Sequence, residues 1–303
     1  MNLQARYGGR FLVGLLSASF LIAPATSKGA VLKEETLNAW GAYVQQANSE
    51  MDDRLHGRFL WVDEVPDRLQ RVRTGNLLVS SIGQHNPKAV PSGLIHHWMG
   101  AAFLSDAKLE DVLGVARDYS HYKEFYKPTV VDSKPLSSTG GCDQYLMLLA
   151  NKEVVAATAL DSEYEACYHQ VGERRWYSVV YTTQVREIRH YGQPDAKELP
   201  PDQGNGYVWR VYGFARFEER EGGVYIVEAI VLSRVVDPIV RRISKNSMLI
   251  SLRQTEEAVR SRAGAAKESG SSTSSSDGVS LSEPHHKPLI ACGSRLRRSF
   301  RGW

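Results

Sequence analysis

The chain has 303 residues, of which 42% are hydrophobic and 23% charged, and its formal net charge at pH 7 is +3. These values are ordinary for a globular protein and allow a core large enough to fold without a metal or disulfides. The small net charge gives no support for a nucleic-acid partner. One large domain or two ordinary ones are compatible with this length.

The N-terminus has the pattern of a secretory signal peptide. Arg6 and Arg10 precede the apolar run Phe11–Ile22, and Ala23-Pro24-Ala25 supplies the small residues that signal peptidase reads. As a helix this run would reach about 18 Å, which is short of a hydrocarbon core of about 30 Å. We expect residues 1–25 to be cleaved and the protein to be exported, to the periplasm or outside the cell. An uncleaved membrane anchor is the alternative.

Residues 31–85 are predicted to form a helical extension that packs on the main domain. Between residues 31 and 60, apolar positions recur at spacings of three and four, which indicates one amphipathic helix. These positions are Thr36, Leu37, Trp40, Tyr43, Val44, Ala47 and Met51. A second helix is expected from Asp67 to Arg73, and a strand from Leu77 to Ile82.

A main domain is predicted over residues 90–263, where most of the chain has the two-residue period of strands. The expected strands are Leu94–Leu104, Thr129–Leu136, Cys142–Ala150, Glu153–Tyr168, Arg174–His190, Tyr207–Arg220 and Val224–Val235. A helix capped by Ser105-Asp106 is expected after the first strand. Short turns between successive strands imply an antiparallel meander. The longer link Tyr191–Gly206 is expected to be a flexible loop at one rim.

The C-terminal part is predicted to be one long helix followed by a tail. Asp237-Pro238 begins the helix, with the aspartate as N-cap and the proline as the first helical residue, and Gly264 ends it. Residues 264–303 are rich in Ser and Gly and end in a basic segment, so we expect a disordered basic tail. Peripheral contact with an anionic membrane surface is compatible with this tail, although a solvated tail is the commoner case.

The cysteines are Cys142, Cys167 and Cys292. If Asn151-Lys152 is a two-residue turn, Cys142 lies opposite Asp161 and about 20 Å from Cys167 along the hairpin. A disulfide requires Cα atoms within about 7 Å. We therefore predict that Cys142 and Cys167 stay free, unless a bulge or a longer turn shifts the register.

The order of strand, helix, six antiparallel strands and long C-terminal helix resembles the START-like, helix-grip superfamily. That superfamily includes lipid-transfer START domains, polyketide cyclases and Bet v 1-like plant ligand binders. The most similar segments are GLIHHWMG at 93–100 and GGVYIVEAIVLSR at 222–234, with Asp237-Pro238 and a helix containing Ser251-Leu-Arg253 after them. More narrowly, the chain resembles an exported bacterial group within this superfamily.

The resemblance implies an α+β fold in which a curved, antiparallel, seven-stranded sheet wraps around the C-terminal helix. An apolar cavity between the two layers is then expected, with a few polar groups that orient a ligand. The superfamily includes carriers, sensors and enzymes, so the fold alone does not decide the function.

Aromatic and charged residues within the expected strands are the candidates for lining this cavity. Tyrosine and tryptophan combine an apolar ring with a polar tip, and a charge on an apolar face is costly unless it is paired or solvated. The candidate ligand-binding residues are His97, Trp98, Tyr145, Tyr181, Trp209, Arg210, Tyr212, Glu228 and Arg234. Trp98 and Trp209 fit the core better than a ligand contact. These strand charges either pair across the sheet or line a wet cavity. If they pair, Glu228 with Arg210 or Arg234 is the candidate, to hold a polar head group or as a structural cross-strand pair.

No pattern predicts a catalytic, metal or cofactor site. The adjacent His96 and His97 point to opposite faces of a strand, so they cannot easily share an ion. No nucleophile elbow, P-loop or dinucleotide fingerprint is present. We expect a protein that binds a lipid or other hydrophobic small molecule. The alternatives are a cyclase or hydratase that uses Glu228 with His97, and a non-catalytic scaffold. The sequence leaves open which sheet face is concave and the oligomeric state.

Overall fold

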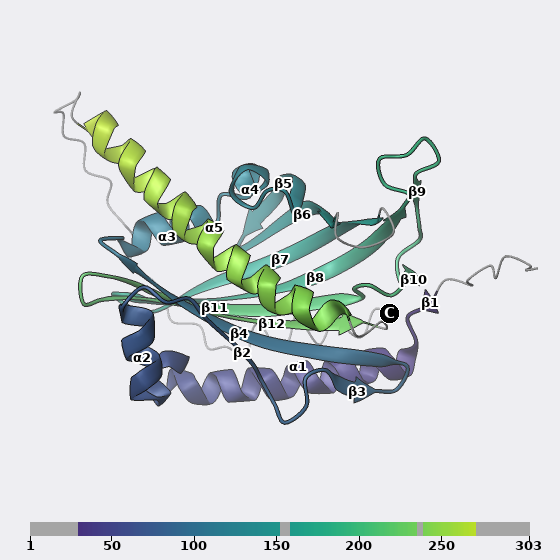
Figure 1. The fold of residues 1–303 in the computed structure, drawn as a ribbon, viewed down its shortest axis with the longest axis horizontal. Helices are drawn as coiled ribbons and strands as arrows, with labels where there is room; N and C mark the ends of the chain where they lie inside the picture. The colour runs from purple at the N-terminus through teal and green to yellow at the C-terminus, as the bar shows by residue number, and fades with distance from the viewer. Residues whose placement is uncertain (1–29, 152–157, 235–238, 271–303) are drawn as a thin grey trace, which may run out of the picture.

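The structure, a computed structural model, describes residues 30–151, 158–234 and 239–270, with side chains described for 30–150, 158–234 and 245–264 (Figure 1). Several predicted features lie outside these residues. They are the signal peptide at 1–25, the helix start at Asp237-Pro238, Cys292, and the part of the tail beyond residue 270.

One antiparallel sheet of ten strands forms the body of the protein. Its main path runs β2-β4-β12-β11-β8-β7-β6-β5, with β3 paired to β4 and β9 paired to β8. The strands are β2 Leu78–Ser81, β3 Lys88–Val90, β4 Gly93–Ser105, β5 Val130–Thr139, β6 Cys142–Asn151, β7 Thr158–Gly172, β8 Arg175–Arg189, β9 Lys197–Glu198, β11 Arg210–Arg220 and β12 Gly223–Arg234. The seven long strands are those that the sequence predicts, and the predicted meander from β5 to β8 is confirmed.

Two long helices cover the sheet, one on each face (Figure 1). Helix α1 (Glu34–Leu55) packs on one face, which we call the α1 face. Helix α5 (Ile239–Gly270) crosses the other, the α5 face, and contacts β4, β2, α3 (Leu109–Ala116) and α4 (Tyr122–Phe125). A sheet of this order folded around a long C-terminal helix is the helix-grip fold, so the fold that the resemblance implies is confirmed.

The central strands bury side chains on both faces because successive residues point to opposite sides. On β4 and β12, the odd-numbered residues face α1 and the even-numbered residues face α5. The α1-face core includes Met99, Ala101, Tyr225, Val227 and Val231. The α5-face core includes Trp98, Ala102, Leu104, Val224 and Ile226. The same two strands therefore contribute to two separate cores.

Helix α1 and the short helices after it pack as a layer on the α1 face, while β2, which the sequence analysis grouped with them, belongs to the main sheet. Trp40, Val44 and Met51 of α1 are buried against the sheet. The short helices η1 (Trp61–Glu64) and α2 (Pro66–Arg73) follow. The first described strand, β1 (Ala30–Val31), pairs with β10 (Gln203–Gly204), so the long link between β8 and β11 contains paired strands where a flexible loop was predicted.

Arg216 of β11 fastens this extension to the sheet. Its side chain is almost fully buried on the α1 face and donates hydrogen bonds to the backbone oxygens of Phe59 and, at 2.6 Å, Met51. Burial lowers the pKa of Arg216 to about 10, so the group is still a cation at neutral pH. Because Met51 lies near the end of α1, the cation also meets the negative end of the helix dipole.

Two predicted helix ends differ from the structure. Strand β4 continues through Ser105, and α3 has Lys108 at its N-cap position without a side-chain cap, so Ser105-Asp106 is not the cap. Asp106 adopts a positive φ of 61° in the turn instead. Helix α5 runs to Gly270, past Gly264, because a single glycine costs only about 1 kcal/mol inside a helix whose neighbours are good helix formers.

The prediction that Cys142 and Cys167 stay free is wrong. Cys142 lies directly opposite Cys167 in the β6–β7 register, and the two sulfurs form a disulfide with a Cα–Cα distance of 4.0 Å. Strand β7 begins at Thr158 and not at Glu153, so the connection after Asn151 is longer than the two-residue turn assumed. This shifts the partner of Cys142 by six residues, from Asp161 to Cys167.

We predict that this disulfide stabilises the fold by restricting the unfolded chain. A loop closed over 25 residues contributes about 3 to 4 kcal/mol to the free energy of unfolding in the loop-entropy account. Double substitution Cys142→Ser with Cys167→Ser should remove this amount in a urea titration. As the control, a reductant should destabilise the wild type and leave the double variant unchanged. A wild type indifferent to reductant would contradict the pairing.

Candidate functional site

The middle of the α5 face has small side chains where a close-packed core would have large ones. In one row across the sheet, Glu228 lies between Gly100 and Ala215, and Ala215 lies opposite Ser178. In the next row, Ile230 is followed by Gly213, Val180 and Ala166. The side chains at the centre of this face therefore project less far from the sheet than large core residues would.

Helix α5 packs along one side of this area of small residues. A Cβ atom placed at Gly100 would lie only 2.8 Å from Leu252 Cδ1 and 2.9 Å from Met248 Sδ, so α5 rests directly on β4 there. Farther across the sheet, side chains on the same face remain only half-buried: Val180, Val211, Ala215, Glu228 and Ile230. We call this area, with Ser178, the α5-face recess.

A wall of tyrosines borders the recess on the side of β6 and β7. The ring of Tyr119 stacks on Tyr145 with centroids 4.0 Å apart, and Tyr145 stacks on Tyr164 at 5.2 Å. The Tyr119 hydroxyl donates to Asp143 at 3.0 Å, and Arg117 donates two hydrogen bonds to the same carboxylate at 2.8 and 2.9 Å. These contacts hold the segment between α3 and α4 against the sheet.

Tyr126 and Thr255 link this wall to α5. Their hydroxyl oxygens lie 3.1 Å apart, and Tyr126 directly follows α4. Tyr168, which shares the row of Glu228, donates its hydroxyl proton to the backbone oxygen of Ala116 at 2.8 Å. The recess therefore has a rim of hydroxyl groups beside a mostly apolar floor.

Glu228 is the one acidic residue in the rows that form this floor. Its carboxyl group makes no hydrogen bond or ion pair with any residue whose side chain the structure describes. Burial raises its pKa to about 7. The pKa of Tyr168 is raised to about 12, chiefly by burial, with the charge of Glu228 as a smaller contribution. At neutral pH the carboxyl group therefore exists both protonated and ionised.

The structure divides the predicted ligand-binding residues between the two faces. Trp98, Tyr145, Glu228 and Arg234 lie on the α5 face, and burial lowers the pKa of Arg234 to about 10. On the α1 face lie His97, Tyr181, Arg210 and Tyr212. Trp209 directly precedes β11 and is buried, and Trp98 belongs to the α5-face core.

The residues on the α1 face have contacts that fasten the N-terminal extension and the long link. His97 Nδ1 lies 3.0 Å from the hydroxyl of Tyr43, and burial, followed by the charge of Arg54, lowers the pKa of His97 to about 4. Tyr212 donates to Asn48 of α1. A ligand between the sheet and α5 cannot reach these side chains through the sheet.

Both predicted partners of Glu228 are wrong. Arg210 lies on the opposite face and pairs with Asp202 through two hydrogen bonds of 2.5 and 3.1 Å. Arg234 shares the face of Glu228 but is six residues farther along β12, about 20 Å away at strand rise. His97 is likewise on the other face, so the suggested pair of Glu228 with His97 is not brought together. The prediction that His96 and His97 face opposite sides is confirmed.

Sequence reasoning missed the small residues that form the recess. The signal is present in β11, where Val211, Gly213 and Ala215 alternate with Tyr212 and Phe214. Small residues at one parity and large residues at the other indicate which face is close-packed and which is not.

Comparisons with known proteins give only distant structural likenesses. Neither a known family pattern nor a curated protein matches the sequence. The STAR-related lipid transfer protein fragment 25–204 from Xanthomonas axonopodis is 16% identical, with a TM-score of 0.42 over 60% of this chain and 98% of that one. Human STARD10 is 9% identical, with a TM-score of 0.42 over 63% and 76%. The Zhui aromatase/cyclase from Streptomyces sp. R1128 is 11% identical, with a TM-score of 0.33 over 57% and 94%.

None of the helices in the described part of the chain is long and apolar enough to cross a membrane.

We predict that Glu228 makes the stability of the protein fall between about pH 4.5 and pH 7 and level off above that range. The folded-state pKa is raised from 4.5 to about 7, so the folded state holds a proton that the unfolded state has lost. This contribution is complete below about pH 4.5 and is lost at higher pH. Between pH 5 and pH 8, the free energy of unfolding of Glu228→Gln should therefore rise relative to that of the wild type, by at most about 3 kcal/mol.

Urea titrations of both proteins at several pH values measure this difference. Glu173→Gln, at an exposed position in the β7–β8 turn, is the control and should follow the wild type at each pH. A constant difference between Glu228→Gln and the wild type would contradict the assignment.

Proposed function

We propose that the protein binds a lipid or another hydrophobic small molecule in the α5-face recess. The observation that carries this proposal is the pair of central rows beside the contact of α5 with β4, in which small residues occupy the α5 face and several side chains stay half-buried. An apolar floor with a few polar groups at its edge is the usual composition of a small-molecule site.

In this proposal the polar groups set the orientation of the ligand. Glu228 accepts a hydrogen bond from a hydroxyl or amine group when it is ionised, and donates one when it is protonated. Tyr126 and Thr255 offer hydroxyls on the side of α4 and α5. The rest of the ligand lies on Val180, Ala215 and Ile230. A mostly apolar molecule with one polar end fits this distribution.

We predict that a large side chain at Ala215 blocks binding. Ala215 is half-buried on the floor of the recess, next to Glu228. Ala215→Phe should lower the affinity for 1-anilinonaphthalene-8-sulfonate at least about tenfold, since the ring occupies the volume that the probe needs. Ala89→Phe on the exposed strand β3 is the matched control and should bind like the wild type.

Organic extraction of the purified chain, followed by mass spectrometry, identifies the natural ligand. The wild type and Ala89→Phe should yield the same co-purified hydrophobic molecule, and Ala215→Phe should yield none. Equal binding by all three proteins would place the ligand elsewhere and overturn the proposal.

We further propose that the protein is exported after removal of residues 1–25. The disulfide supports an oxidising compartment, because such bonds are rare in the reducing cytosol. N-terminal sequencing of the protein from a cell-envelope or culture fraction should then begin at Thr26. Recovery of the intact N-terminus from the cytosolic fraction would contradict export.

A further inference from the structure

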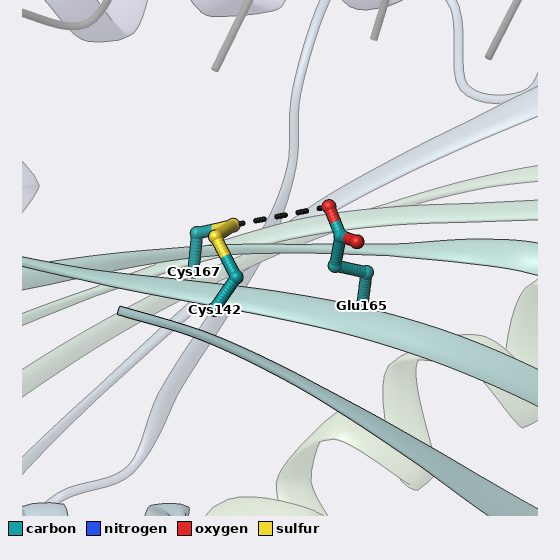
Figure 2. Close-up of side chains that lie close together, drawn as sticks. All are labelled: Cys142, Glu165 and Cys167. Atoms are coloured by element: carbon teal, nitrogen blue, oxygen red, sulfur yellow. Dashed lines mark hydrogen bonds between the residues drawn. A yellow bond between two sulfur atoms is a disulfide. The ribbon is translucent and has the colours of Figure 1, made fainter. Parts of the chain in front are cut away.

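A second cluster of chemically active side chains lies on the α1 face of β6 and β7, near the β5 edge of the sheet. Cys142 begins β6, and Glu165 and Cys167 lie on β7, two residues apart and on the same face (Figure 2). The two sulfurs and a carboxylate oxygen all lie within 4.8 Å of one another. Oε1 of Glu165 is 4.0 Å from Sγ of Cys167. This cluster is on the opposite face from the recess.

The carboxylate of Glu165 is buried and held by neutral groups. Its side chain is only 8% exposed, and no lysine, arginine or histidine in the described part of the chain forms an ion pair with it. Tyr181 donates its hydroxyl proton to Oε1, and Gln144 Nε2 donates to Oε2 at 3.3 Å. A buried carboxylate without a cationic partner is costly, and a bound cation beside it removes that cost.

We propose that, when the disulfide is reduced, Cys142, Cys167 and Glu165 bind one thiophilic divalent cation such as Zn²⁺. Cysteine thiolates and carboxylates are both established zinc ligands, and sites with three protein ligands leave the fourth position to water or an outside ligand. Zinc–sulfur bonds of about 2.3 Å in a tetrahedral site require the two sulfurs to lie about 3.8 Å apart. A cross-strand pair with Cα atoms 4.0 Å apart reaches that separation by side-chain rotation.

The disulfide excludes the cation because its sulfurs carry no negative charge. A dithiol reductant supplies two electrons and two protons, which break the sulfur–sulfur bond and form two thiols, while the reductant becomes a disulfide. Binding of the divalent cation then releases both thiol protons. Cys142 is partly exposed and Gln144 is exposed, so a reductant and an ion can reach the cluster from solvent.

Cadmium titration of the full chain tests this site. The protein is reduced with dithiothreitol, desalted without oxygen, and titrated with Cd²⁺ while the thiolate-to-cadmium absorbance is followed. We expect one equivalent bound per reduced chain and none per oxidised chain. Competition with Zn²⁺ then gives its affinity. Cysteine substitution Cys142→Ser should abolish stoichiometric binding, and Cys292→Ser should leave it unchanged.

The role of the carboxylate needs its own variants. Glu165→Gln should weaken Cd²⁺ binding at least about tenfold, and Glu163→Gln, at the next acidic position along β7, should not. Equal affinity in the wild type and Glu165→Gln would overturn the three-ligand site. If the reduced chain unfolds, refolding on addition of one equivalent of Cd²⁺ supports the site, and the absence of refolding overturns it. Neither result depends on ligand binding in the recess.

Discussion

The central strands must bury both of their faces, and the rest of the structure depends on this constraint. A strand covered on both sides needs apolar residues at both parities, and β12 reads Val-Tyr-Ile-Val-Glu-Ala-Ile-Val-Leu after its first glycine. Tyr225 and Val227 enter the core beneath α1, while Val224 and Ile226 enter the core beneath α5. The N-terminal extension is therefore an integral layer, since its removal would expose half of the central side chains to water.

The two faces are packed differently, and this difference locates the candidate site. On β11 the α1 face carries Tyr212, Phe214 and Arg216, all buried, and Arg216 closes the end of α1 through backbone oxygens. The α5 face of the same strand carries Gly213 and Ala215. Dense packing against α1 stabilises these strands from one side. On the proposal that a small molecule binds the α5 face, this packing lets the other side of the same strands carry small side chains.

Most of the fold follows from sequence patterns, because alternation and turn residues are local signals. Strands β4, β5, β6, β8, β11 and β12 and helix α1 lie where periodicity places them. Which helix covers which face could not be predicted. Odd and even positions in a strand show that Glu228 and His97 lie on opposite faces, but they do not show which helix packs on each face. The disulfide was missed for a related reason. Hairpin register depends on turn length, and the segment after Asn151 has no Asn-Gly or Asp-Gly signal to fix it. A shift of six residues in the pairing of β6 with β7 brings Cys142 opposite Cys167.

Glu228 interrupts the apolar sequence of β12. In the proposed complex, its position favours a ligand that carries a polar group. A carboxyl group whose pKa is raised to about 7 by burial destabilises the folded protein whenever it is ionised. A residue with only a packing role would be apolar at this point, as Ile226 and Ile230 are on either side. A ligand that donates a hydrogen bond stabilises the ionised form and brings the pKa back down. Binding near pH 7 then releases a proton, which a purely apolar ligand would not do.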